Sequence, residues 1–221
     1  MKWRFFFLVP LLIISFDSNV FSQDSLKWQI GIHVGPDASI YYGVPTIKKN
    51  FGMKYQLNPG YVVGLTAQYH IKSKSNLCAE VNLERKGNIV SADEGVSLGD
   101  ERLETRADYI TVPLTYKYLL GKKYVRFFIQ AGPYIAFLAG MKAHVPAYGT
   151  YTESLKYYQA IDYGAVIGLG PVISLSDRIL FTVEIRNNLG LHRLTKYKSS
   201  INENAKNESF ALLFGLQLKL G

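Results

Sequence analysis

The sequence predicts an all-β fold, namely an eight-stranded antiparallel up-and-down transmembrane β-barrel with short periplasmic turns and long extracellular loops. Three observations support this prediction. Apolar and polar residues alternate along eight segments, the connections between the segments alternate between short and long, and one of the two faces is almost free of charge. The composition agrees, because 19 glycines, 16 tyrosines and 12 phenylalanines are typical of strands and turns.

The eight segments show a period of two, which places alternate side chains on opposite faces of a strand. In the first segment, for example, Trp28, Ile30 and Ile32 share one face with Val34. The eight segments span residues 28–35, 61–72, 77–84, 110–118, 125–137, 163–173, 181–185 and 210–220. Most of them extend over about ten residues, the length that a tilted strand needs to cross a bilayer.

The connections provide a second and independent signal. Long connections are predicted at 36–59, 88–106, 140–160 and 191–207, and short ones at 72–76, 121–123 and 174–178. Long and short connections alternate without exception. An even number of antiparallel strands with this arrangement is typical of outer-membrane barrels, with both termini on the periplasmic side.

A soluble barrel that holds an apolar ligand inside would also show alternation. Its polar face would be solvated and rich in Lys and Glu, whereas the polar face here carries mainly Gly, Thr, Asn and Gln with isolated charges. The apolar face is bounded by aromatic residues such as Trp28, Tyr124 and Tyr163, as expected at membrane interfaces. These features favour the membrane barrel.

The N-terminal segment predicts export. Lys2 and Arg4 precede an apolar run of 12 residues, and short residues at Val20 and Ser22 follow. We therefore predict a cleaved signal peptide over residues 1–22 and a barrel domain over residues 23–221. The alternative, a membrane anchor, needs roughly 20 apolar residues. The predicted mature chain carries 23 basic and 16 acidic residues, so its formal net charge is +7.

Four segments resemble the outer-membrane β-barrel family described as porin-family or PorT-like. They are YITVPLTYKY at 109–118, AGPYIAFL at 131–138, DYGAVIGLG at 162–170 and RNNLGL at 186–191. The resemblance covers the whole predicted mature chain and implies an eight-stranded barrel in a Gram-negative outer membrane, usually without a known activity. Such barrels tend to end on an aromatic residue, whereas this sequence ends on Leu220 and Gly221, which weakens the signal for assembly.

Three prolines fall within the predicted strands. Pro113, Pro133 and Pro171 each lack a backbone N–H, and a closed barrel has no free edge at which this loss would be harmless. We therefore expect β-bulges at these positions.

Charged residues on the polar face predict what fills the barrel. The inward positions include the acids Glu80, Glu84, Asp162 and Glu184 and the bases Lys117, Arg126, Arg186 and Lys219. Counted from the short turns, Glu80, Lys117, Arg126 and Glu184 lie at similar depth, so we expect a salt-bridged plug there, completed by Gln68, Gln130 and Gln217. An eight-stranded barrel is just wide enough for its own side chains. The alternative is a charge-lined path through a narrow porin or transporter for small solutes.

Catalytic signatures are absent from the sequence. Small barrels of this kind can be lipid-modifying enzymes, which need a nucleophile or an activated water beside a histidine and a carboxylate. His33 and His70 face the lumen, and neither His144 nor His192 repeats a known signature. The one cysteine, Cys78, excludes an internal disulfide and a Cys-based zinc site. We therefore predict no enzymatic activity, no cofactor and no metal site.

The predicted extracellular loops contain the candidate binding residues, because loops held on a rigid scaffold often carry recognition. They are Lys48, Lys49, Lys54, His192, Arg193, Lys196 and Lys198. The expected partners are outer-membrane lipid, lipopolysaccharide or glycans, or a protein of the envelope or secretion machinery. The alternative is that the loops are solvated and anchor at the headgroups. The positive charge is divided between lumen and loops, so nucleic acid is not expected, and neither is oligomerisation.

Overall fold

The computed structural model describes residues 27–43, 53–92, 102–121, 124–145, 149–152, 155–196 and 204–220. The predicted signal peptide, residues 1–22, lies outside these residues. The strands are β1 (Trp28–Tyr42), β2 (Met53–Gln56), β3 (Asn58–Lys72), β4 (Ser75–Ala92), β5 (Arg102–Leu120), β6 (Val125–Val145), β7 (Gly149–Thr152), β8 (Ile161–Ser174), β9 (Ile179–Gly190) and β10 (Lys206–Leu220), with the short helix η1 (Leu155–Tyr157). No helix in the described segments is long and apolar enough to cross a membrane.

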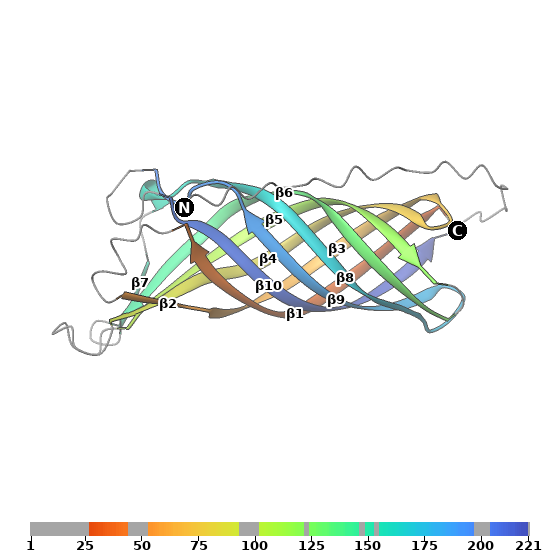
Figure 1. The fold of residues 1–221 in the computed structure, drawn as a ribbon, viewed down its shortest axis with the longest axis horizontal. Coiled ribbons are helices and arrows are strands. Elements are labelled where there is room, and N and C mark those ends of the chain that lie inside the picture. Colours follow the sequence, from red (N-terminus) through yellow and green to blue (C-terminus); the bar gives the residue numbers. More distant parts are fainter. Residues whose placement is uncertain are drawn as a thin grey trace, which may run out of the picture.

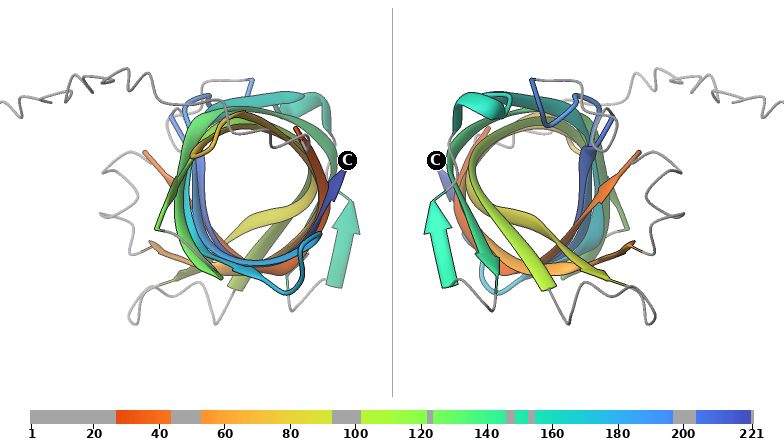
Figure 2. Two further views of the ribbon diagram at one scale, coloured as in Figure 1. Left: turned by 90° about the vertical axis from the view of Figure 1, so that its right-hand side faces the viewer. Right: turned by 90° about the vertical axis from the view of Figure 1, so that its left-hand side faces the viewer.

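Eight long strands close into the predicted antiparallel barrel. Each strand pairs with the next in the order β1, β3, β4, β5, β6, β8, β9 and β10, and β10 pairs back with β1, from Leu220 beside Trp28 to Lys206 beside Tyr42. Figure 2 shows the resulting ring from both ends. The short strand β2 pairs with β4, and the short strand β7 pairs with β6. Both lie at the end of the barrel opposite to the C-terminus (Figure 1).

Strands in the described segments extend further toward the long loops than the sequence predicted. The predicted loop at 88–106 is too wide, because β4 continues to Ala92 and β5 begins at Arg102, with Ser91 opposite Arg102. Likewise, β1 reaches Tyr42 and β6 reaches Val145. The apolar alternation stops before these positions while the backbone pairing continues. A pattern based on hydrophobicity therefore ends the strands too early.

The two faces of the wall differ as expected for a membrane barrel. Side chains such as Ile32, Leu65, Val81 and Ile185 point outward and are more than half exposed on the isolated chain. The inward positions between them are buried and largely polar: Gln29, His33, Thr66, Gln68, Glu80, Asn82, Glu84, Thr182, Glu184 and Arg186. The apolar outward surface, here called the belt, is therefore the surface suited to contact with lipid.

The predicted bulges at the prolines are wrong. The register of β5 against β6 is the same before and after Pro113, and β8 keeps one register against β9 on both sides of Pro171. Pairing is interrupted next to these two prolines, since a residue without an N–H cannot donate, but no extra residue is inserted. Pro133 keeps its place opposite Ala165. The register shift between β5 and β6 lies at Asp108 and Tyr109.

Apolar side chains also occupy both ends of the lumen. Leu119, Phe128, Val172 and Leu180 form a buried cluster within a few residues of the short turns. A second cluster lies toward the long loops and contains Ala107, Tyr109, Tyr134, Ala136, Met141 and Val166. Lys117 contacts the first cluster at Phe128, and Lys86 and Asp162 contact the second at Tyr134.

Replacing Leu65 by lysine tests the belt. Leu65 lies at the middle of β3 and is 63% exposed. A lysine near the bilayer midplane is expected to reduce the free energy of unfolding in phospholipid vesicles by about 2–4 kcal/mol. Leu175 is equally exposed at 60% but lies in the turn between β8 and β9, so Leu175→Lys should cost at most about 1 kcal/mol. Equal losses in urea titrations of the two variants would contradict this assignment of the belt.

Candidate functional site

A buried ion-pair triad lies at the centre of the lumen. The Arg186 guanidinium donates from Nη1 and Nη2 to the Glu80 carboxylate at 2.6 and 2.9 Å. It also donates from Nε to Glu184 Oε1 at 2.7 Å. Arg186 and Glu184 lie two residues apart on β9, whereas Glu80 comes from β4 on another part of the wall. The triad therefore links distant strands across the interior.

Neutral side chains complete the hydrogen bonds of the triad. Gln130 Nε2 donates to Glu184 Oε1 at 2.7 Å, and Asn82 Nδ2 donates to Glu80 Oε2 at 3.1 Å. His33 Nε2 lies 2.9 Å from Asn82 Oδ1 and 3.8 Å from Glu80 Oε2. The two carboxylates thus have hydrogen-bond donors in addition to the guanidinium, which offsets part of the cost of removing them from water.

Glycines on the inward face leave the space that this network occupies. A Cβ atom on Gly168 would lie 2.1 Å from Glu184 Oε1, and one on Gly64 would lie 1.9 Å from Asn82 Oδ1. Gly168, in the DYGAVIGLG segment, is therefore explained by packing inside a narrow barrel.

A second charged cluster lies nearer to the long loops. Lys86 Nζ contacts Glu84 Oε2 at 2.7 Å, and both side chains are almost completely buried. Glu84 also accepts hydrogen bonds from Thr111 Oγ1 at 2.9 Å and from Asn188 Nδ2 at 3.2 Å. The Lys86 ammonium lies 5.1 Å from the centroid of the Tyr134 ring, close enough for a cation–π contact.

Asp162 joins this second cluster from β8. Its Oδ2 accepts hydrogen bonds from the Tyr134 hydroxyl at 3.3 Å and from Asn207 Nδ2 at 3.2 Å. Glu84 and Asp162 are among the predicted inward acids, whereas Lys86 is not among the predicted inward bases. The period of two could have found Lys86. If the strand is continued past Glu84, Lys86 falls on the same inward face as Glu84.

The predicted ion pairs of Lys117 and Arg126 with Glu80 and Glu184 are wrong in their partners. Both carboxylates pair with Arg186. Lys117 lies beside Asn76 on β4, four residues from Glu80, or roughly 13 Å along the strand. Its ammonium instead lies 4.5 Å from the centroid of the Phe128 ring. Lys117 and Arg126 line a small cavity near the short turns, together with Gln68 and Gln217.

The remaining residues of the predicted lumen set and glutamine set are distributed along the barrel. Lys219, partly buried, follows the inward Gln217 by two residues near the end of β10. Gln68 Nε2 donates to Gln29 Oε1 at 3.1 Å and Gln68 Oε1 accepts from Cys78 Sγ at 3.4 Å, so Gln68 belongs to a glutamine layer apart from the triad.

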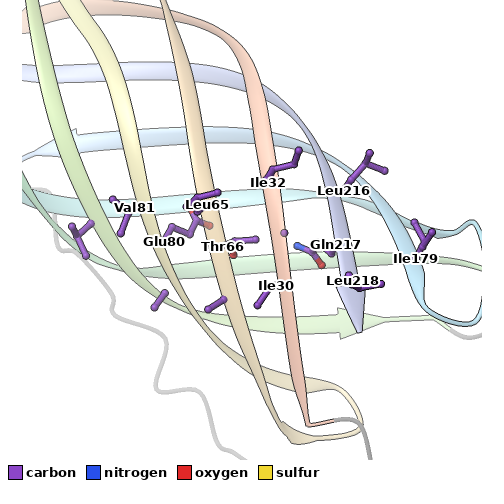
Figure 3. Close-up of a pocket in the computed structure, with 14 residues that line it drawn as sticks. Ile30, Ile32, Leu65, Thr66, Glu80, Val81, Ile179, Leu216, Gln217 and Leu218 are labelled. Carbon is purple, nitrogen blue, oxygen red and sulfur yellow. The ribbon is translucent and has the colours of Figure 1, made fainter. Parts of the chain in front are cut away.

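A depression lies on the outside of the wall. It has a volume of about 780 Å³ and is lined mainly by outward apolar side chains of β1, β3, β4 and β10 (Figure 3). Ile30, Leu65, Val81 and Leu216 are among them. Because these side chains belong to the belt, we assign the depression to the lipid contact surface.

The candidate loop residues have different positions. Lys48, Lys49 and Lys198 lie outside the described residues. Lys54 is exposed on β2, and Arg193 and Lys196 lie in the segment after β9, where Arg193 is partly buried and Lys196 is exposed. His192 stacks on Tyr163 with 4.9 Å between ring centroids, and its Nδ1 lies 3.0 Å from the Ile161 carbonyl oxygen.

Basic residues form a collar between the belt and the long loops. Within the described side chains it contains the bases Lys54, Arg85, Arg102, Arg106, Lys142, Arg193, Lys196 and Lys206 and the acids Glu104, Asp108 and Glu208. Arg85 pairs with Asp108 at 2.7 Å, and Arg106 pairs with Glu104 at 2.7 Å. Lys142 lies directly opposite Arg106 on the neighbouring strand and is exposed. The collar thus has eight positive and three negative charges.

Comparison with known families now identifies the barrel. Residues 21–196 match the model of the outer membrane protein beta-barrel domain family. The chain belongs to this family. No curated protein matches the sequence.

Solved structures of outer-membrane barrels share the fold. Neisserial surface protein A (NspA) has a TM-score of 0.52 and 12% identity, over 87% of this chain and 97% of that one. The outer membrane protein OprG from Pseudomonas aeruginosa has a TM-score of 0.51 and 14% identity, over 88% and 97%. Ail, the attachment invasion locus protein of Yersinia pestis, is more distant, with a TM-score of 0.41 and 12% identity over 86% and 99%. At these identities the similarity concerns the fold alone.

Replacing Gly168 by alanine tests the packing of the triad in this outer-membrane barrel. The new methyl group would displace Glu184, which Arg186 and Gln130 hold in place. We expect a loss of about 1–3 kcal/mol in the free energy of unfolding, measured by urea titration in vesicles. Gly140 provides the matched control, because a Cβ there meets no atom within 4 Å, and Gly140→Ala should not destabilise the barrel. Unchanged stability of Gly168→Ala would show that the lumen can relax.

Proposed function

We propose that this protein is a non-enzymatic outer-membrane barrel with a structural, binding or accessory role in envelope assembly or secretion. In this proposal the barrel is exported by its signal peptide, its long loops face the cell exterior and its lumen is plugged. The observation that carries the proposal is the Arg186 triad, which joins β4 and β9 across the interior with both carboxylates paired. An outer-membrane barrel of the PorT-like type would fit this role.

Pairing of the lumen charges supports a plug over a conduction path. A solute path needs charged groups that water and solute can reach, whereas Arg186 is only 2% exposed and Lys86 is also 2% exposed. Their counterions are already inside the barrel at 2.6–2.7 Å. Removing one member would leave an unpaired buried charge, which typically costs 3–5 kcal/mol. The network is therefore suited to rigidity.

Planar bilayer recordings test the plug. The wild-type barrel is expected to give no stable channels, because side chains fill its lumen. Replacing Glu80, Glu184 and Arg186 by alanine together removes the triad without leaving an unpaired partner within it, and this variant should show small, frequent conductance steps. Alanine at both Arg85 and Asp108 removes an outward ion pair instead and should leave the bilayer silent. Stable channels of porin size in the wild type would replace the plug with the narrow-porin alternative.

Histidine contacts in the loop region support a non-catalytic role. His144 Nδ1 lies 2.8 Å from Thr150 Oγ1, and His192 Nδ1 lies close to a backbone carbonyl oxygen. These partners position the rings within the sheet and the loop, whereas a general base is commonly oriented by a carboxylate.

The collar supports a role in binding an anionic partner at the outer surface. We propose lipopolysaccharide as this partner. Arg106 and Lys142 are like charges directly opposite each other; Glu104 pairs with Arg106 at 2.7 Å, whereas Lys142 is exposed. Lys206 adds a further cation near the loops, with its ammonium 5.9 Å from the centroid of the Tyr42 ring. The candidate loop residues Lys48, Lys49 and Lys198 belong to the same proposal.

Two triple variants test the collar with equal changes in charge. Glutamine at Lys54, Lys142 and Lys206 is expected to weaken lipopolysaccharide binding by about tenfold or more, since each cation near an anionic surface contributes up to about 1 kcal/mol. Glutamine at Lys27, Lys72 and Lys74 removes three exposed charges at the opposite end and should leave the affinity unchanged. Binding would be measured by thermophoresis at two salt concentrations. Equal effects of both triples would mean that net charge alone attracts the ligand.

A further inference from the structure

The depression on the outside of the wall contains two small residues side by side. Ala67 on β3 and Ala79 on β4 lie directly opposite each other, and both line the depression. The larger side chains Ile30, Leu65 and Val81 also line it (Figure 3). Its volume of about 780 Å³ is in the range of sites that hold an apolar small molecule. The belt therefore contains a hollow that is suited to a hydrocarbon chain.

The depression occupies one half of the bilayer span. Leu65 lies at the middle of β3, and the other lining residues of β1, β4 and β10 lie between the middle of their strands and the short turns. Ile179, also in the lining, directly follows the turn between β8 and β9. The strand β3 has 15 residues, or about 50 Å along its axis, whereas one leaflet of hydrocarbon is about 15 Å thick. The depression thus faces the leaflet on the short-turn side.

An aromatic pair marks the level of the headgroups in this leaflet. Trp28 and Tyr69 lie opposite each other, two positions beyond the pair formed by Ile30 and Ala67. Their ring centroids are 4.9 Å apart, and Trp28 is 52% exposed. Tryptophan and tyrosine are enriched where a membrane meets water. A lipid whose chain lay in the depression would therefore have its headgroup beyond Trp28.

Exposed bases lie just beyond this aromatic pair, at the short-turn end. They are Lys27, Lys72, Lys74 and Arg178, here called the rim. Lys27 directly precedes Trp28, and its carbonyl oxygen accepts a hydrogen bond from the backbone N–H of His70 at 2.8 Å. The described parts of the short turns contain one acid, Asp177. The rim therefore adds positive charge at the level where a lipid phosphate would lie.

We propose that the depression and the rim together bind an anionic phospholipid of the periplasmic leaflet. One acyl chain lies in the depression, and the phosphate lies beyond Trp28 and Tyr69, next to the rim. Cations close to a membrane surface attract anionic lipids, so the rim selects the headgroup while the depression holds the chain. The assignment to the periplasmic leaflet rests on the proposed orientation of the barrel. The site is separate from the collar, which lies at the other end of the strands.

Quenching of Trp28 fluorescence by brominated lipids tests the site. The sequence has two tryptophans, Trp3 and Trp28, so Trp3→Phe in the full chain makes Trp28 the one reporter. The barrel would be refolded in phosphatidylcholine vesicles with an increasing share of either brominated phosphatidylglycerol or brominated phosphatidylcholine. At low salt, half-maximal quenching should require about fivefold less of the brominated phosphatidylglycerol, the preference expected from one cation near the phosphate.

Two triple variants with equal changes in charge separate the rim from net charge. Glutamine at the three rim lysines should remove the preference for phosphatidylglycerol. Glutamine at Lys54, Lys142 and Lys206 of the collar should retain it. Each variant is compared with itself in the two lipids, so a change in the amount of folded barrel affects both curves alike.

A matched pair of phenylalanine variants tests the depression. Ala79→Phe fills the hollow and should raise the share of brominated phosphatidylglycerol that half-maximal quenching requires. Ala131 is an exposed alanine in the short-turn half of β6 and does not line the depression. Ala131→Phe should therefore leave the quenching curves unchanged.

Four results would overturn the proposal. Equal quenching by the two lipids in the Trp3→Phe chain would show that no selective site lies near Trp28. Full preference in the rim triple would place the charge effect elsewhere, and equal losses in both triples would assign it to net charge. Full preference in Ala79→Phe would remove the depression from the site. None of these measurements uses lipopolysaccharide or conductance, so they leave the collar and the plug to their own tests.

Discussion

The narrow lumen of a closed eight-stranded barrel is the constraint on which the rest of this structure depends. Lipid cannot satisfy backbone hydrogen bonds, so the strands must close on themselves, from β1 to β10. Closure at eight strands leaves space for side chains alone. Charges buried at its centre are costly unless they are paired, and Arg186 is paired with two carboxylates. The glycines follow from the same constraint, since Gly168 and Gly64 face the bulky polar groups that fill the centre.

The period of two in the sequence was sufficient to predict the strands, their faces and the inward position of eight charged residues. It could not predict which of them meet. Glu80 and Arg186 are 106 residues apart, and their contact depends on how the tilt of the strands brings β4 and β9 together. Depth counted from the turns ignores this tilt, so it places Lys117 level with Glu80 although Lys117 lies beside Asn76. Lys86 was missed for another reason. The apolar face ends near Leu83, but the ladder continues for nine more residues to Ala92.

The distribution of charge explains how a basic protein can have an interior without excess charge. The described inward residues comprise the acids Asp37, Glu80, Glu84, Asp162 and Glu184 and the bases Lys86, Lys117, Arg126, Arg186 and Lys219. These two sets balance, so the net positive charge of the described barrel lies on its outer surface, in the collar and around the short turns. The two kinds of charge obey different rules. The Arg186 and Lys86 ion pairs are buried at low dielectric, whereas collar charges are screened by salt.

Although the lumen contains equal numbers of acidic and basic residues, the two kinds are not evenly distributed along the barrel. Arg186 lies between Glu80 and Glu184, so that part of the lumen carries one excess negative charge, and Asp37, Glu84 and Asp162 outnumber Lys86 near the long loops. The compensating cations, Lys117 and Arg126, lie toward the short turns, separated from these acids by several residues of strand. Such separation is costly in a medium of low dielectric constant. A barrel that retains it must either gain rigidity from the paired centre or neutralise its ends with ions.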